Sequence, residues 1–306
     1  MLRKVGAIDM GSNSLRMLTA LVGDKGLQPV HSELRETRLG EKLYDGGPLY
    51  PPARIRTLAA FAELLNIMEE GEVERGIVVA TSAVREAADG APFLREMEII
   101  SPYPVRLLSS REEALYGFRG AVGGEARMSS DNILVLDLGG RSSEFSWEDR
   151  GVFHFCSFTF GAVSLSETFS PINSGQKIKA FQSLQIQVQE ELNKEKALAV
   201  AAASRELVGL GGTVTTLAAL ANGVKNFESG CVHGCCLSRE EIDSSAQKLR
   251  DSTPAERVKL LSFAPKRADI IPAGAVTLST IMKSLGKEVL QVSEHGLLHG
   301  ALKELY

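Results

Sequence analysis

The chain has 306 residues, of which 44% are hydrophobic and 24% are charged. This composition is typical of a folded globular protein and excludes an intrinsically disordered chain. At about 150 residues per domain, the length predicts two domains. The net charge is only -4, so broad neutralisation of nucleic-acid phosphates is not expected. Any site for an anionic ligand must therefore be local.

The cysteine content and the apolar pattern indicate a cytoplasmic protein that binds neither membranes nor nucleic acids. The four cysteines are too few and too clustered for the disulfide framework of a small secreted protein. The most apolar stretch, residues 197–221, is interrupted by Arg205 and Glu206, and no run reaches the ~18 apolar residues that a membrane span needs. Near the N-terminus, Asp9 interrupts the only stretch that resembles a signal peptide.

The first half of the chain begins with a predicted β-hairpin. Residues 5–8 form a buried apolar strand, residues 15–19 alternate as the returning strand, and a polar turn joins them. A helix is predicted from Pro51-Pro52, because apolar residues follow at helical spacing: Ile55, Leu58, Phe61, Leu65 and Met68. Residues 77–80 predict a further buried strand, followed by a helix that starts near Thr81 or Ser82.

The opening pattern returns in the second half. Residues 133–137 predict a strand, residues 139–142 a turn and residues 143–147 a returning strand, so that Asp9-Met10-Gly11 corresponds to Asp137-Leu138-Gly139. A repeat at half the chain length predicts two similar domains. The remaining predicted helices are residues 190–198, 212–221, 238–250, 268–285 and 297–305.

Three glycine-rich loops suggest phosphate binding. A glycine-rich turn exposes consecutive backbone N–H groups to phosphate oxygens, and an aspartate at the end of the preceding strand can hold a hydrated divalent cation beside them. The third loop contains Gly211, Gly212 and Thr213 and leads into a helix, whose N-terminus attracts anions. Each loop alone is better explained as an ordinary turn, but the three together favour phosphate binding. The two hairpins would then grip one polyphosphate from opposite sides.

These segments resemble the exopolyphosphatase / guanosine pentaphosphate phosphohydrolase family of the actin-like ATPase superfamily. The matching segments run along almost the whole chain and include AIDMGSNSLRMLTA, VVATSAVREA, SSREEALYGFRGAV, ILVLDLGGRSSE, LVGLGGTVTTLAAL and RADIIPAGAVTL. The chain is similar to the short, two-domain form. The resemblance implies an α/β fold of two actin-like (ribonuclease H-like) lobes, residues 1–125 and 126–306, with the active site in the cleft between them. It also implies that the last helix, about residues 297–305, packs back on the first lobe.

The resemblance further implies Mg²⁺-dependent hydrolysis of the terminal phosphoanhydride bond of polyphosphate, guanosine pentaphosphate or both, by direct attack of water. By position, Glu113 matches the catalytic base, Glu144 a second glutamate that positions the water, and Asp9 and Asp137 the aspartates near the metal. The residues matched to the phosphate site are Asn13, Ser14, Arg85, Gly139, Gly140 and Ser142. Arg141 stands where the family usually has a third glycine, and either constrains the loop or adds a cation that faces phosphate. Family habit also implies a homodimer.

Other interpretations of the same residues stay open at this point. The string Ser110-Arg111-Glu112-Glu113 has the form of a helix capping box, as does the identical string at residues 238–241. Arg85 and Glu144 could be solvated surface positions. The cluster of Cys231, Cys235 and Cys236 with a nearby histidine suggests zinc, but no second cluster accompanies it, which favours ordinary thiols.

Two other classes of function also remain. The protein could bind polyphosphate or guanosine tetraphosphate as a sensor without hydrolysing it, with Arg141 impairing turnover. It could instead be a kinase-type ATPase that transfers phosphate to an acceptor.

Overall fold

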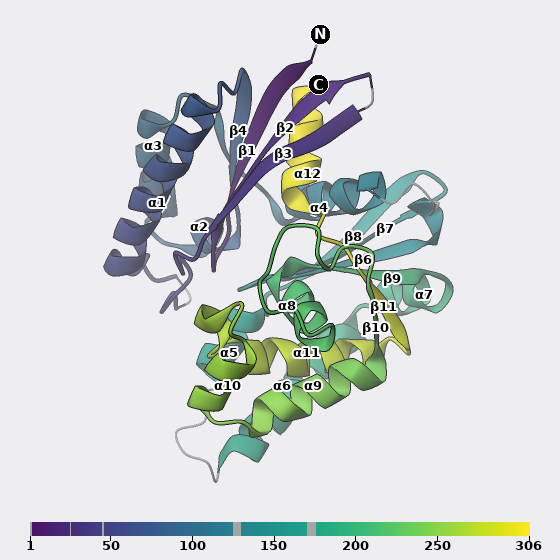
Figure 1. The fold of residues 1–306 in the computed structure, drawn as a ribbon. Helices are drawn as coiled ribbons and strands as arrows, with labels where there is room; N and C mark the ends of the chain where they lie inside the picture. The colour runs from purple at the N-terminus through teal and green to yellow at the C-terminus, as the bar shows by residue number, and fades with distance from the viewer. Residues whose placement is uncertain (1, 25, 45, 125–129, 170–175) are drawn as a thin grey trace. The chain divides into compact units, whose positions relative to one another are not determined.

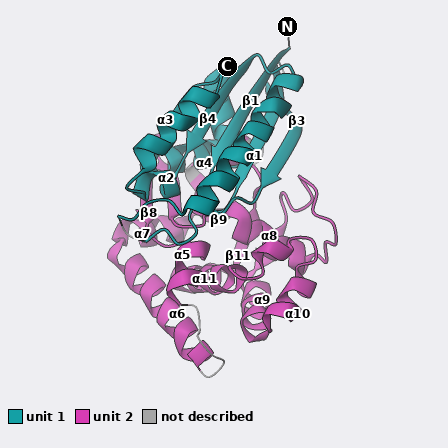
Figure 2. Ribbon diagram, turned by 90° about the vertical axis from the view of Figure 1, so that its left-hand side faces the viewer, with its two compact units in different colours: residues 1–120, 296–306 teal, residues 121–295 magenta. Residues whose placement is uncertain are grey.

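The chain folds into two compact units in a computed structural model that describes residues 2–24, 26–44, 46–124, 130–169 and 176–306. Unit 1 consists of residues 1–120 together with the C-terminal residues 296–306, and unit 2 consists of residues 121–295 (Figure 2). The expected boundary between residues 125 and 126 lies outside the described residues.

Unit 1 is built on a mixed five-stranded sheet with the order β3-β2-β1-β4-β5 (Figure 1). β1, β2 and β3 form an antiparallel meander, whereas β4 and β5 run parallel to β1. The strands are β1 (Arg3–Met10), β2 (Leu15–Gly23), β3 (Gly26–Arg35), β4 (Arg75–Ala80) and β5 (Val105–Leu107). Because β1, β4 and β5 are parallel, their carboxyl ends lie at one edge of the sheet.

Helices cover both faces of this sheet, because its central strands are apolar on both sides. Ile8 and Met10 of β1 pack in a cluster with residues of α1 (Pro51–Glu70) and α3 (Gly90–Ile100). Val5 and Ala7 pack on the opposite face with residues of α4 (Ser110–Gly124) and α12 (Leu297–Leu302). The C-terminal helix α12 is thus part of the core of unit 1, and the short helix η4 (Lys303–Leu305) follows it.

Close contact between α4 and α12 explains two of the glycines in unit 1. A Cβ atom added at Gly300 would come within 2.0 Å of the Tyr116 carbonyl oxygen, and one added at Gly120 within 2.0 Å of the Gly296 carbonyl oxygen. The backbones of the two segments therefore touch directly, with no room for a side chain at either position.

Unit 2 repeats the strand order of unit 1 with one strand more, as β10-β11-β9-β6-β7-β8. β6, β7 and β8 form the meander, β9 and β11 run parallel to β6, and β10 is an antiparallel edge strand. The strands are β6 (Ile133–Leu138), β7 (Ser143–Asp149), β8 (Val152–Phe158), β9 (Glu206–Leu210), β10 (Cys236–Ser238) and β11 (Val289–Val292). The shared order confirms the internal repeat and the α/β class.

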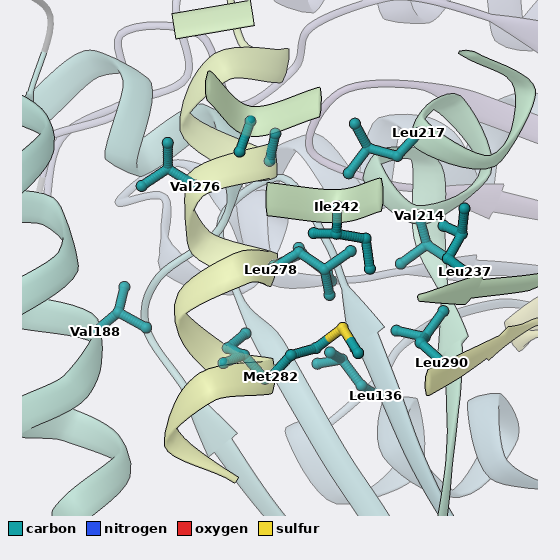
Figure 3. Close-up of a cluster of buried hydrophobic side chains, with 14 of the residues drawn as sticks. Leu136, Val188, Val214, Leu217, Leu237, Ile242, Val276, Leu278, Met282 and Leu290 are labelled. Carbon is teal, nitrogen blue, oxygen red and sulfur yellow. The ribbon is translucent and has the colours of Figure 1, made fainter. Parts of the chain in front are cut away.

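The core of unit 2 lies between one face of its sheet and a layer of helices (Figure 3). Leu136 of β6 and Leu290 of β11 meet Val188, Ile242 and Leu278 from three different helices. Leu278 belongs to the central helix α11, of which twelve consecutive residues, 271–282, are buried. The helices are α5 (Ala162–Thr168), α6 (Lys177–Lys194), α7 (Lys196–Ser204), α8 (Gly211–Ala221), α9 (Arg239–Asp251), α10 (Pro254–Leu260) and α11 (Ile271–Ser284), with short 3-10 turns η1 (Ser130–Asn132) and η3 (Pro265–Arg267).

One predicted helix has the wrong bounds. The helix expected at residues 190–198 is the end of α6 and the start of α7, which meet at Glu195. In α1, Ile55 is 67% exposed, and Thr57 is buried, with its hydroxyl donating to the Ala53 carbonyl. That internal hydrogen bond satisfies the hydroxyl, so burial of a threonine costs little.

Among the described residues, no helix has the length and apolar character needed to cross a membrane.

Candidate active site

The predicted phosphate loops of the two units have the same local geometry. In unit 1 the Gly11 N–H donates to the Ser14 carbonyl at 3.1 Å, and in unit 2 the Gly139 N–H donates to the Ser142 carbonyl at 3.1 Å. Each bond closes a four-residue turn directly after a strand that carries an aspartate one residue before its end, Asp9 or Asp137. The pairing of the two motifs that the sequence predicted is therefore confirmed for the backbone.

In unit 1 the first loop is held by neighbouring segments. The Ser12 hydroxyl lies 2.9 Å from that of Ser82, at the start of α2 (Ser82–Glu86), in a buried hydrogen bond. The Arg38 N–H donates to the Asn13 carbonyl at 2.9 Å, which fixes the turn from its other side. Asn13 is half-buried and Ser14 is buried.

The side chains of Arg85 and Glu113 form an ion pair at the same edge of the sheet. Arg85 Nη1 donates to Glu113 Oε2 at 3.0 Å and to the Leu108 carbonyl at 2.8 Å. The two side chains are only 24% and 11% exposed. Arg85 follows β4 and Glu113 follows β5, so the parallel strands bring both to the carboxyl edge where Gly11 follows β1. Arg85 is therefore not a solvated helix residue.

The capping-box alternative for Glu113 is wrong by one residue. Glu112 makes the cap: its carboxylate accepts from the N–H and the hydroxyl of Ser109, at 2.9 and 2.8 Å, and its own N–H donates to Ser109 Oγ at 3.2 Å. At the identical string in α9, the last glutamate, Glu241, makes these bonds with Ser238. Because a second serine, Ser109, precedes Ser110, the cap forms one residue earlier in the chain, between Ser109 and Glu112, and Glu113 takes no part in it.

The second loop is anchored to α5 through its carbonyl groups. The Gly139 carbonyl accepts from Ala162 N–H, and the Gly140 carbonyl from Val163 and Ser164 N–H, at 2.7 to 3.1 Å. A trans peptide directs a carbonyl and the following N–H in opposite directions. The N–H groups of Gly140 and Arg141 therefore point away from α5, as a phosphate cradle requires.

Arg141 is buried in this loop, and its guanidinium pairs with Glu167 of α5 at 3.7 Å between Nη1 and Oε2. The side chain is 8% exposed. An arginine side chain thus fits within the turn and brings a positive charge to it.

Carboxylates oppose each other across the second hairpin. Asp137 on β6 is the register partner of Glu144 on β7, whereas Asp9 in the first hairpin is the partner of Arg16. Directly opposed residues share one face of a sheet, and like charges in that position repel. Glu144 is 2% exposed, so it is not a solvated strand position, and Ser157 Oγ donates to its Oε1 at 3.1 Å.

The third loop begins α8 beside Asp137. Gly211 has φ +90°, and a Cβ atom there would lie 2.9 Å from Asp137 Oδ1 and 2.5 Å from the Leu138 carbonyl oxygen. A Cβ atom at Gly212 would lie 2.0 Å from Arg267 Nη1, and Thr213 is buried. The first N–H groups of α8 thus share their surroundings with a carboxylate and a buried guanidinium.

Arg267 was missed by the sequence reasoning. Its segment, RADIIPAGAVTL, matches the family, but the position of the arginine beside a glycine 55 residues earlier depends on the packing of η3 against α8. The sequence did contain one signal, since Arg267 directly precedes the long apolar segment of α11. An arginine that is buried beside such a helix needs a specific partner or ligand.

The cysteine cluster shows no sign of a zinc site. Among the described residues, no three His, Cys, Asp or Glu side chains are grouped to hold a metal ion. His233 accepts a hydrogen bond from the Glu294 N–H at its Nδ1 and stacks on His295, with ring centroids 4.1 Å apart.

The fourth cysteine, Cys156, lies apart from this cluster on β8. Burial, with the carboxylates of Glu195 and Glu144 adding to it, raises the pKa of the Cys156 thiol to about 12, which does not suit a nucleophile.

Comparison with known proteins agrees with this geometry. The Ppx/GppA phosphatase family matches residues 19–306. Exopolyphosphatase 2 of Mycobacterium tuberculosis is 32% identical over 98% of this chain and 97% of its own length. Among solved structures, an exopolyphosphatase-like protein has a TM-score of 0.89 at 29% identity, over 99% of this chain and 98% of that one. The Aquifex aeolicus Ppx/GppA family member has a TM-score of 0.81 at 28% identity, over 100% and 98%.

A protein of much lower sequence identity has a similar fold. A nucleoside triphosphate hydrolase of Neospora caninum, 11% identical, has a TM-score of 0.51 over 98% of this chain and 91% of that one. At this identity the likeness concerns the fold alone.

The cap assignment predicts different effects for two adjacent serines. Ser109→Ala removes the side-chain acceptor of the α4 cap and is expected to lower the free energy of unfolding by about 1 kcal/mol. Ser110 is the first residue of the helix and caps nothing, so Ser110→Ala is expected to change the free energy of unfolding by only a few tenths of a kcal/mol, roughly. Urea unfolding of both variants measures the difference, and equal effects would contradict the assignment.

The same cap predicts a pH dependence of stability. The N–H and hydroxyl of Ser109 hold the pKa of Glu112 below its ordinary value of 4.5. The stabilisation by ionised Glu112 is therefore complete above pH 4.5 and is lost as the pH falls through the lowered pKa. Wild type and Glu112→Gln should differ in unfolding midpoint at pH 7, and the difference should shrink as the pH falls below 4.5. A small difference is expected, because solvent screens a side chain that is 39% exposed.

Proposed function

Since the chain belongs to the Ppx/GppA phosphatase family, we propose that it hydrolyses the terminal phosphoanhydride bond of inorganic polyphosphate, guanosine pentaphosphate or both. Inorganic polyphosphate is the first substrate to test, because the M. tuberculosis relative is named an exopolyphosphatase. The observation that carries the proposal is the second hairpin, where the opposed carboxylates Asp137 and Glu144 adjoin a glycine-rich turn.

The loops supply what an anionic chain end needs. The N–H groups of Gly140 and Arg141 and the start of α8 are donors for phosphate oxygens. Arg267 adds a buried positive charge in unit 2, and Arg141 and Arg85 add guanidinium groups that are each paired with a glutamate. Fixed donors and charges of this kind stabilise the charge that spreads over the transferred phosphoryl group. This local supply of cations is compatible with a net charge of -4.

The acidic residues fit Mg²⁺. Magnesium takes oxygen ligands, keeps several of its waters, and binds through one or two carboxylates together with substrate phosphates. Asp137, opposed to Glu144 and 2.9 Å from the Cβ position of Gly211, would hold the ion in unit 2, and Asp9 would contribute in unit 1. When bound, the ion would neutralise charge on the phosphates.

Glu113 and Glu144 would act on the attacking water. In a loose transition state the water needs orientation more than early loss of its proton. The ion pair with Arg85 fixes the direction of the Glu113 carboxylate, which suits orientation of the water followed by late acceptance of its proton. Cys156, with its raised pKa, would take no part in the reaction.

Glu113→Gln tests the proposed base. The amide keeps the size and a hydrogen bond to Arg85 but accepts no proton, so kcat for phosphate release from polyphosphate is expected to fall by about 10²- to 10⁴-fold. The fold should stay intact, because Glu112 and not Glu113 caps α4. Phosphate release and the unfolding midpoint are measured together.

Glu241→Gln is the matched control, since it changes the same position of the same four-residue string at the start of α9. It should leave kcat within about twofold of wild type and affect stability only. An active Glu113→Gln enzyme would refute the assignment. Tight binding of polyphosphate by wild type with no phosphate release at any Mg²⁺ concentration would favour a sensor, and phosphate on an acceptor would favour a kinase.

Removal of the metal tests the role of the carboxylates. Dialysis against EDTA is expected to abolish phosphate release, and added Mg²⁺ should restore it. Asp137→Asn should raise the Mg²⁺ concentration for half-maximal activity by about tenfold or more, because one charged ligand is lost. Asp251→Asn, which changes an exposed aspartate paired with Arg250, should leave that midpoint unchanged. Activity that persists in EDTA would disprove the metal requirement.

A further inference from the structure

Ser157 makes a contact that its place in the fold does not require. It lies on β8, an edge strand of the unit 2 sheet, and is exposed to solvent. Its hydroxyl nevertheless donates to Oε1 of Glu144 at 3.1 Å, and Glu144 is 2% exposed. Ser157 is also the register partner of Glu144 across β7 and β8. The two side chains therefore share a face of the sheet.

The hydrogen bond has a physical consequence for the carboxylate. A buried carboxylate is costly unless hydrogen bonds compensate for lost water, and a bond to a charged acceptor is stronger than one between neutral groups. A donor fixed at Oε1 also fixes the plane of the carboxyl group. The direction of Oε2 is then set by the backbone of two paired strands.

The internal repeat provides a comparison within the same molecule. In unit 1 the position equivalent to Glu144 is Arg16, the partner of Asp9, and the partner of Arg16 on β3 is Leu34. Unit 1 thus has neither the carboxylate nor the hydroxyl at these positions. The serine accompanies the glutamate, and the sheet forms without either in the other unit.

We propose that Ser157 is a positioning residue for hydrolysis, which acts by holding the carboxylate of Glu144 in its productive orientation. The inference rests on the proposed function, since it gives Glu144 the role of directing the attacking water. Ser157 touches neither substrate nor metal in this account. It acts on the rate of the chemical step and leaves phosphate binding to the glycine-rich loops.

The test compares Ser157→Ala with Ser157→Thr and a matched control. Ser157→Ala is expected to lower kcat by about tenfold with KM changed less than twofold, since a hydrogen bond to a charged group is lost. Ser157→Thr keeps the hydroxyl and suits a strand, so it should recover kcat to within about threefold of wild type. The control is Ser279→Ala, which removes a serine-to-carboxylate bond to Asp243 in the same unit, between α11 and α9. It should leave kcat within about twofold.

A double-mutant cycle shows whether Ser157 acts through Glu144. In a Glu144→Asp background the shorter carboxylate no longer meets the hydroxyl, so adding Ser157→Ala should cost less than about twofold. An equal loss in both backgrounds overturns the inference, as does a Ser157→Ala enzyme with full activity or a loss that threonine fails to recover. Wild-type protein that releases no phosphate overturns the proposed function itself, and the inference with it. An active wild type with an insensitive Ser157 overturns the inference alone.

Discussion

The hydrogen bond that closes each four-residue turn, from Gly11 to Ser14 and from Gly139 to Ser142, is the constraint on which the rest of the site depends. The bond closes a four-residue turn between two neighbouring strands of the sheet. Because the turn is so short, the aspartate near the end of the first strand lies beside the backbone N–H groups of the turn. Glycine suits the first position of both turns, because a Cβ atom would lie only 3.1 Å from the Ser14 carbonyl oxygen at Gly11 and 2.9 Å from the Ser142 carbonyl oxygen at Gly139. The remaining residues of each half-site are brought to this turn by parallel strands that end at the same edge.

The parts of the fold that the sequence predicted are those set by local pattern. The two hairpins, their aspartates and the start of α8 follow from strand periodicity and glycine placement, which act over about ten residues. The half-chain repeat made the topology predictable as well, since a second copy of the hairpin requires a second sheet. The boundary inside residues 190–198 was missed because the break at Glu195 has neither proline nor glycine to mark it.

The site residues that the sequence left open are those defined by tertiary contacts. Glu112 and Glu113 are adjacent and identical in type, and only the position of Ser109, directly before α4, decides which of them caps the helix. The partner of Glu113 is Arg85, 28 residues earlier, and the pairing requires β4 and β5 to be neighbours. Likewise Arg267 reaches Gly212 only through the packing of η3 against α8. No spacing rule along the chain encodes such contacts.

The two hairpins share a backbone conformation but differ in the charge that stands opposite their aspartates. Asp9 is opposed by Arg16, so the first hairpin carries a cation within its own sheet. Asp137 is opposed by Glu144, so the second hairpin has two carboxylates on one face, with the start of α8 and Arg267 close by. Repulsion between opposed carboxylates is relieved when a cation joins them. The repeated hairpin therefore has an opposite charge across from its aspartate in one unit and a like charge in the other. This repulsion is the reason that the pair Asp137 and Glu144, rather than the pair Asp9 and Arg16, is proposed to gain most from a bound metal ion.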